Sequence, residues 1–246
     1  MRIRAVIFDL GNTLLYFEGN WSEVLARANQ MMFDSLIRSG LQLEQEDFVT
    51  SFRQRLEAYH QQREVDYKEH STHWILKDTL AEGGYPDVGE PVLRDALAAM
   101  YAASQEYWVP EKDLLPTLES LAHHGYRIGL LSNAGDDRDV QKLVDKGRIR
   151  PYLEYVLTSA AGGIRKPDSR IFELAINMFG LEPDEVAMVG DTLGADILGA
   201  NKMGIYSIWI TRRADTSENR KLRQTIIPDA EIDTLAELPD LLAGLK

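Results

Sequence analysis

Cysteine is absent from this 246-residue chain, which excludes disulfides, thiol nucleophiles and cysteine-ligated zinc sites. A basic surplus is absent too, because 27 Lys and Arg stand against 39 Asp and Glu and the net charge is −12. Nucleic acids and anionic membranes are bound through basic surfaces, so neither is expected as a partner. No apolar run in the sequence approaches a membrane span, which needs about 18 residues. We therefore expect a soluble, cytoplasmic protein.

The first predicted element is a strand over the four consecutive apolar residues Ala5 to Phe8. Apolar residues that do not alternate with polar ones are typical of a strand covered on both faces in a parallel α/β sheet. Asp9 follows directly, ahead of a turn at Gly11 and Asn12. Open α/β sheets bind ligands at the carboxyl ends of their strands, so Asp9 is a candidate site residue. Asp before Gly-Asn is also ordinary turn chemistry, and this stretch alone allows both interpretations.

A helical pattern follows the first strand. Asn20 is a suitable N-cap, and apolar residues then recur at spacings of three and four. Further helices are predicted over 48–59, from near 68 to 83, and from Pro91 through Trp108. Residues 18–112 therefore form a predicted four-helix unit, and we expect its aromatic side chains to make its core.

Strands and helices alternate from about residue 113 onward. Strands are predicted at 126–132, 155–157, 186–189 and 205–210, with helices between them. This alternation indicates a parallel sheet with helices on both faces. The predicted fold class is α/β: a Rossmann-like core of residues 1–17 and 113–246, with residues 18–112 inserted as an α-helical cap.

Polar residues follow the predicted strands at their carboxyl ends or in the loops between them. They are Asp9 after the first strand, Ser132 and Asn133 after the second, Lys166 in the loop before the fourth, and Asp191 and Asp196 after the fourth. A right-handed parallel sheet brings such ends to one edge. Each residue alone fits a turn or a helix start, but their joint occurrence favours a functional site.

These stretches resemble the four motifs of the haloacid dehalogenase superfamily. They read Asp9-Leu-Gly-Asn-Thr13, Leu131-Ser132-Asn133, Arg165-Lys166-Pro167-Asp168 and Gly190-Asp-Thr-Leu-Gly-Ala-Asp196. The similarity covers nearly the whole chain, because members of this type carry a helical cap after the first strand. The resemblance implies a hydrolase, and specifically a Mg2+-dependent phosphatase acting on a small phosphomonoester.

The resemblance also implies residue roles. Asp9 would be the nucleophile, forming an aspartyl-phosphate that water then hydrolyses. Mg2+ would be held by the carboxylates of Asp9 and Asp191 and by the backbone carbonyl of Gly11. Ser132 would donate a hydrogen bond to a phosphoryl oxygen, and Lys166 would neutralise phosphoryl charge. The remaining positions are Asn133 as a further substrate-binding residue, Asn133 and Thr13 as loop supports, and Asp196 as the residue that orients Lys166 and the metal-bound waters.

Gly11 departs from the phosphatase pattern, in which a second Asp at this position protonates the leaving group. General acid–base catalysis is worth about 10²–10⁴ in rate, so the departure matters. One explanation is an acid from the cap or its hinge, for which Glu18, His60, His70 and His73 are candidates. Another is a leaving group that needs little protonation, as in an anomeric or acyl phosphate.

Three other functions fit part of the pattern. Haloacid dehalogenases also lack the second Asp, but they do not need the metal-binding residue that Asp191 provides. Phosphonoacetaldehyde-cleaving relatives have a small residue at the Gly11 position and a cap lysine, for which Lys68 and Lys77 are available. A near-inactive binding or regulatory protein would keep the fold and lose turnover. Neither a particular substrate nor an oligomeric state is predicted.

Overall fold

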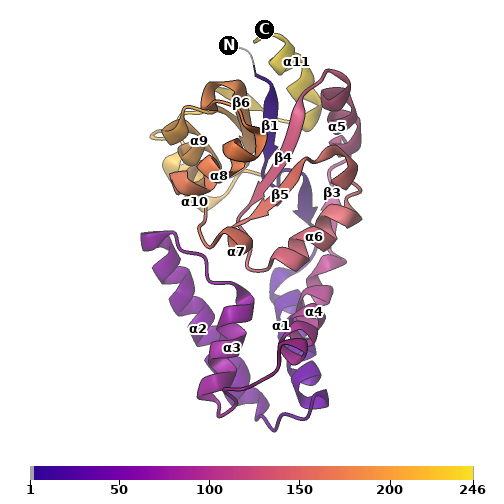
Figure 1. Ribbon diagram of the computed structural model, residues 1–246, viewed down its shortest axis with the longest axis vertical. Coiled ribbons are helices and arrows are strands. Elements are labelled where there is room, and N and C mark those ends of the chain that lie inside the picture. The colour runs from indigo at the N-terminus through magenta and orange to yellow at the C-terminus, as the bar shows by residue number, and fades with distance from the viewer. Residues whose placement is uncertain (1–2, 246) are drawn as a thin grey trace.

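A computed structural model describes residues 3–245, and its main sheet confirms the α/β prediction (Figure 1). Six strands lie in the order β5-β4-β1-β6-β7-β8, and every pairing between them is parallel. The strands are β1 (Ala5–Phe8), β4 (Arg127–Ser132), β5 (Tyr155–Thr158), β6 (Val186–Gly190), β7 (Tyr206–Ile210) and β8 (Ala230–Ile232). Because the strands are parallel, their carboxyl ends share one edge of the sheet.

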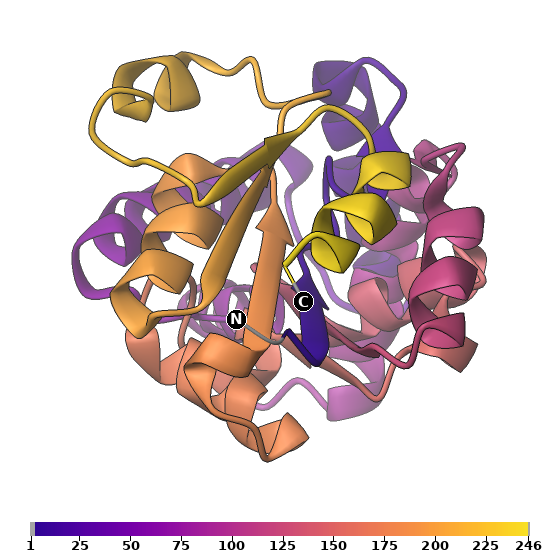
Figure 2. The same ribbon diagram turned by 90° about the horizontal axis from the view of Figure 1, so that it is seen from above.

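Both faces of the sheet are covered, which explains the unbroken apolar run in β1. Val6 and Phe8 belong to the core on one face, while Ala5 and Ile7 belong to the core on the other. One face packs against α5 (Leu114–His123), α6 (Asp137–Lys146) and α11 (Leu238–Ala243), and the other against α8 (Ser169–Phe179) and α9 (Leu198–Met203). Figure 2 shows the strands between these helices.

Four helices form a separate unit beyond the carboxyl ends of the strands (Figure 1). They are α1 (Trp21–Arg38), α2 (Gln45–Asp66), α3 (Thr72–Glu82) and α4 (Glu90–Gln105). Their buried side chains, among them Met32, Phe52 and Leu93, make a core of their own. The side chain of Asn20 caps α1, as predicted, by accepting a hydrogen bond from the backbone N–H of Ser22. The third helix begins later than predicted, because Ser71 provides its N-cap.

A small antiparallel sheet joins the start of this helical unit to its end. Strand β2 (Leu15–Phe17) pairs with β3 (Trp108–Pro110), so the prediction that the fourth helix runs through Trp108 is wrong. The helix ends at Gln105, and the chain then becomes extended. Beyond β3, the buried carboxylate of Glu111 forms ion pairs with Arg212 and Arg213. This connection fixes Trp108 beside the end of β1.

Two short helices lie in the segments that flank the candidate site. They are α7 (Ser159–Gly162), before the loop that carries Lys166, and α10 (Ser217–Leu222), within the basic segment that follows β7. Across residues 3–245, no helix combines the length and the apolar character that crossing a membrane requires.

Candidate active site

Asp9, Ser132, Lys166 and Asp191 come together at the carboxyl edge of the sheet. Asp9 follows β1 and Asp191 follows β6, the strand that pairs with β1 on one side. Ser132 ends β4, the strand that pairs with β1 on the other side. All four residues are at most 8% exposed. Buried polar groups are costly unless they are paired, so this cluster needs compensating partners.

The ammonium group of Lys166 lies between two carboxylates. Its Nζ is 2.6 Å from Oδ1 of Asp9 and 2.6 Å from Oδ1 of Asp196. It also donates a hydrogen bond of 2.8 Å to the backbone carbonyl of Leu131. The ammonium therefore donates hydrogen bonds to Asp9 and to Leu131, and it forms an ion pair with Asp196.

Negative charge exceeds positive charge in this cluster, because one ammonium faces three carboxylates. Oxygen atoms of Asp9, Asp191 and Asp196 lie within 4.8 Å of one another. Burial raises the pKa of Asp9 to about 6, although Lys166 acts in the opposite direction. Burial, and then the charges of Asp9 and Asp196, raise the pKa of Asp191 well above its ordinary value. A divalent cation with oxygen ligands would relieve this excess of negative charge.

Lys166 stays protonated despite its burial. Loss of hydration lowers its pKa, but the charges of Asp196 and Asp9 and their hydrogen bonds outweigh this effect and raise it. The same attraction opposes the rise in the pKa of Asp9. The lysine therefore favours the ionised form of the carboxylate that would act as nucleophile.

Asp196 is held by the loop after β6. It lies in a π-helical turn, Leu193–Ile197, and its Oδ2 accepts a hydrogen bond of 3.0 Å from the backbone N–H of Thr192. Gly190 makes room for it, since a Cβ there would lie 2.3 Å from Cγ of Asp196. No ordinary side chain fits that approach, and the glycine is therefore required for the position of Asp196.

The backbone of Asp191 is fixed by two residues that the sequence did not indicate. Its carbonyl accepts hydrogen bonds of 2.8 Å from Nε1 of Trp209 and 2.8 Å from Nδ2 of Asn219. The side chain of Asn219 also accepts a bond from the backbone N–H of Leu193. Asn219 lies in α10, within a polar segment that resembles a surface loop, but the residue is buried and its hydrogen bonds show its role.

Asn133 positions the loop that carries Lys166. Its Nδ2 donates to the carbonyl of Lys166 at 3.0 Å, and its Oδ1 accepts from the N–H of Lys166 at 2.9 Å. Thr13, in the loop after β1, is buried, and its Oγ1 has no hydrogen-bond partner among the described residues. The predicted support role of Thr13 remains a prediction.

A cavity of about 470 Å³ lies over these groups. Seven of the eight predicted site residues line it: Asp9, Gly11, Ser132, Asn133, Lys166, Asp191 and Asp196. Thr13 is not among its lining residues. Side chains that sequence reasoning did not single out for the site also line it: Trp21, Trp108, Asp139 and Arg165. No signal in the sequence marks the aromatic pair, because both residues fall within the predicted four-helix unit, whose aromatic side chains are expected to make its core.

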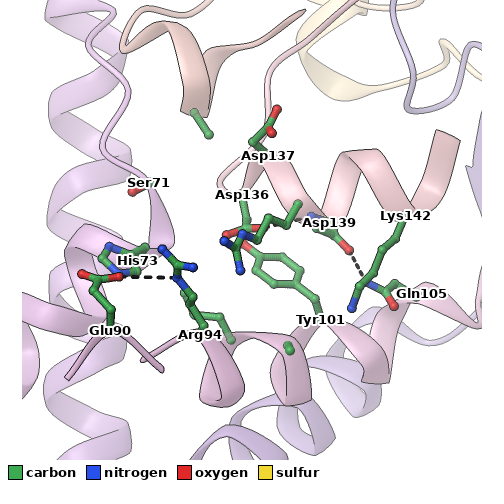
Figure 3. A pocket seen from close by; sticks show the side chains of 14 residues that line it. Ser71, His73, Glu90, Arg94, Tyr101, Gln105, Asp136, Asp137, Asp139 and Lys142 are labelled. Carbon is green, nitrogen blue, oxygen red and sulfur yellow. Dashed lines mark hydrogen bonds and ion pairs between the residues drawn. The ribbon is translucent and has the colours of Figure 1, made fainter. Parts of the chain in front are cut away.

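The predicted substitutes for the missing acid lie elsewhere. Glu18 is exposed and lines none of the cavities described here. His60 and His70 line a neighbouring cavity of about 210 Å³, which shares Trp21 with the site cavity. His73 lines a third cavity, of about 390 Å³, between α4 and α6 (Figure 3). Lys68 and Lys77 line neither the site cavity nor these two neighbours.

The helical unit contacts the Lys166 loop directly. The segment between α2 and α3 forms an antiparallel bridge, Lys68 opposite Ile164. The N–H of Glu69 donates to the carbonyl of Gly163 at 3.0 Å, and the N–H of Arg165 donates to the carbonyl of Tyr67 at 2.9 Å. The Glu69 carboxylate is buried and lies 3.9 Å from the Arg165 guanidinium. Any movement of this segment is therefore coupled to the loop that carries the catalytic lysine candidate.

A parallel sheet with a carboxylate cluster and one lysine at its carboxyl edge is the arrangement of haloacid dehalogenase-like hydrolases. The family model of haloacid dehalogenase-like hydrolase matches residues 3–204, and the chain belongs to this family. The protein is thus a hydrolase, as the sequence predicted. Residues from all four of the family's motifs line one cavity.

Comparison with known proteins gives phosphatases among the relatives. The chain is 28% identical over 243 residues to a glyceraldehyde 3-phosphate phosphatase of Methanopyrus kandleri, covering 99% of this chain and 98% of the relative. A solved phosphatase of the same family from Thermococcus onnurineus is 27% identical, with a TM-score of 0.66 over 99% of both chains. A 2-haloacid dehalogenase from Pseudomonas syringae has a TM-score of 0.72 at 23% identity, over 99% of this chain and 100% of its own. Because phosphatases and dehalogenases share this fold, side chains must separate the two activities.

Proposed function

We propose that the protein is a Mg2+-dependent phosphatase that hydrolyses a small phosphomonoester through an aspartyl-phosphate on Asp9. The observation that supports this most is the buried group of Asp9, Asp191 and Asp196, in which three carboxylates face one ammonium. Dehalogenation needs an ionised nucleophile but no second metal-binding carboxylate. A phosphatase needs both, because its substrate is itself an anion.

The residues present fit a magnesium ion. The carboxylates of Asp9 and Asp191 and the carbonyl of Gly11 would hold it, since Mg2+ prefers oxygen ligands. When bound, the ion would neutralise charge on the phosphoryl oxygens and reduce their repulsion of an anionic nucleophile. The buried cluster carries the uncompensated negative charge that such an ion requires.

The chain's own residues would act on the phosphoryl group in two steps. In the first, a carboxylate oxygen of Asp9 bonds to phosphorus while the bond from phosphorus to the leaving oxygen breaks. In the second, water attacks phosphorus, inorganic phosphate leaves and the carboxylate is restored. Lys166 would keep Asp9 ionised and attract the phosphoryl oxygens, and Ser132 would donate a hydrogen bond to one of them.

The helical unit, residues 18–112, would act as a cap over a core of residues 1–17 and 113–246. Its contact with the Lys166 loop, through Tyr67 and Glu69, supports this assignment. A cap that closes excludes water and bulky substrates, so a small metabolite ester is favoured over a phosphoprotein. The relative named as a glyceraldehyde 3-phosphate phosphatase also has a small phosphate ester as its substrate.

Haloacid dehalogenation is the second candidate, because a 2-haloacid dehalogenase shares the fold and Gly11 provides no acid. The two activities are separated by measuring phosphate release from 4-nitrophenyl phosphate and halide release from 2-chloropropionate. We expect phosphate release with Mg2+ that disappears with EDTA and with Asp9→Asn. The matched control Asp184→Asn changes an exposed carboxylate and should keep full activity. Metal-independent halide release without phosphate release would refute the phosphatase proposal.

A further inference from the structure

An indole ring occupies the space next to Gly11. A Cβ on Gly11 would lie 3.5 Å from Cη2 and 3.7 Å from Cζ3 of Trp108. Trp21 lines the same cavity, and the Phe17 ring packs edge-on against both, with centroids 4.7 Å from Trp21 and 5.7 Å from Trp108. We call Trp21 and Trp108, backed by Phe17, the aromatic wall. It provides no proton to a leaving group.

The other groups that line the cavity offer few proton donors. Its ionisable residues are Asp9, Asp139, Arg165, Lys166, Asp191 and Asp196. The ammonium of Lys166 is bound between the carboxylates of Asp9 and Asp196 and is not free to protonate a leaving group. A guanidinium does not act as a general acid in proteins, which excludes Arg165. Asp9 is the proposed nucleophile, and Asp191 and Asp196 belong to the buried carboxylate cluster around Lys166. Asp139 is therefore the one remaining candidate acid among the residues that line the cavity.

Asp139 is engaged by a residue that does not belong to the aromatic wall. Its Oδ1 accepts a hydrogen bond of 2.8 Å from Nε2 of Gln105, and Figure 3 shows its carboxylate pointing toward that residue at the end of α4. Burial raises its pKa to about 6, so it is the alternative acid that a test must examine. Its bond to Gln105 favours a structural contact between α4 and α6.

We propose that the site selects phosphates with a planar leaving group that departs as a stable anion, namely aryl or acyl phosphates. This inference rests on the proposed phosphatase function. When Asp9 bonds to phosphorus, the electron pair of the breaking P–O bond stays on the leaving oxygen, and a phenolate or carboxylate forms. These anions need no proton, whereas the alkoxide from an alkyl phosphate does. The aromatic wall contacts the planar group and excludes water from it.

The test is the dependence of kcat/KM on leaving-group basicity, measured with phenyl phosphates whose substituents raise the pKa of the phenol. For the wild type we expect a fall of about 100-fold or more across the series, and still lower activity on glycerol 3-phosphate, because the missing acid is worth about 10²–10⁴. Gly11→Asp keeps the backbone carbonyl and installs an acid, and the φ of Gly11 is not in the left-handed region. It should flatten the dependence and increase turnover of glycerol 3-phosphate.

Asp139→Asn separates this account from its alternative. If Asp139 were the acid, its loss would slow basic leaving groups selectively and make the dependence steeper. That result, or a shallow dependence in the wild type, would overturn the inference even if Gly11→Asp fails to fold. The absence of Asp9-dependent phosphate release from every ester would instead overturn the phosphatase proposal, so the two failures are distinguishable.

The aromatic wall has a test of its own. Trp21 is 54% exposed, so Trp21→Ala should not disturb folding. We expect a several-fold rise in KM for phenyl phosphate with little change in kcat, since the ring would bind ground state and transition state alike. Trp74→Ala is the matched control, because Trp74 is 49% exposed and does not line the site cavity. Equal KM values in the two variants would show that the wall does not contact the leaving group.

Discussion

Lys166→Met replaces the single ammonium of the carboxylate cluster with an apolar side chain of similar length. The variant loses ion pairs of 2.6 Å to Asp9 and to Asp196 and the bond to Leu131. Removal of one partner from a buried ion pair costs about 3–5 kcal/mol. For a chain of this size, 1 kcal/mol shifts Tm by about 2–4 °C, so we expect Tm to fall by roughly 6–20 °C.

The loss of stability in Lys166→Met should depend on pH. Lys166 lowers the pKa of Asp9 in the wild type, so that pKa rises further without the lysine. A carboxylate whose pKa is raised by folding destabilises the protein as pH rises, and this destabilisation disappears when the carboxylate is protonated. The Tm difference between variant and wild type should therefore be largest near about pH 7.5 and shrink toward about pH 5.

The assay is thermal unfolding followed by circular dichroism, in EDTA, with Lys112→Met as the control for loss of one exposed positive charge. A Tm for Lys166→Met that equals that of the control at both pH values would contradict this prediction. Lys166 would then not be the counter-ion that compensates the buried carboxylates.

Three further predictions concern the metal and the helical unit. Asp191→Asn removes a carboxylate whose pKa is raised by burial. Thermal melts in EDTA should therefore show a higher Tm for the variant than for the wild type, and added Mg2+ should not raise the Tm of the variant further. A lower Tm for the variant in EDTA would contradict this prediction. Mg2+ affinity, measured by titration calorimetry, should fall below about pH 6, because protonation of Asp9 removes a ligand charge; a pH-independent affinity would count against Asp9 as a ligand. Glu69→Gln should weaken the contact with Arg165 and speed hydrogen exchange at residues 163–165. Unchanged exchange would show that this contact does not hold the loop that carries Lys166.

The central sheet was predictable because its signals are local. The unbroken apolar run Ala5 to Phe8 indicated a strand buried on both faces, and the alternation of strands and helices indicated parallel pairing. Parallel pairing then placed Asp9, Ser132 and Asp191 at one edge, where the structure has them. The helices were predictable for the same reason, since periodicity and caps lie within each segment.

Features that depend on distant partners were not predictable. Strands β2 and β8 have three residues each, too few for a pattern, and β2 pairs with β3, which the chain reaches only after all four helices α1 to α4. Trp108 continued the helical spacing of α4 in the sequence, yet it lies in β3 beside Gly11. Asn219 has polar neighbours and no motif, and its bond to Asp191 exists only in the folded chain.

The most direct test of the account is a search for phosphate on Asp9. The wild-type protein is mixed with Mg2+ and acetyl phosphate, quenched in acid within the first turnovers, digested and analysed by peptide mass spectrometry. We expect a phosphorylated peptide that contains Asp9 and is absent with EDTA and in Asp9→Asn. Phosphate release without any phosphorylated Asp9 under single-turnover conditions would contradict it, because water would then attack the substrate directly.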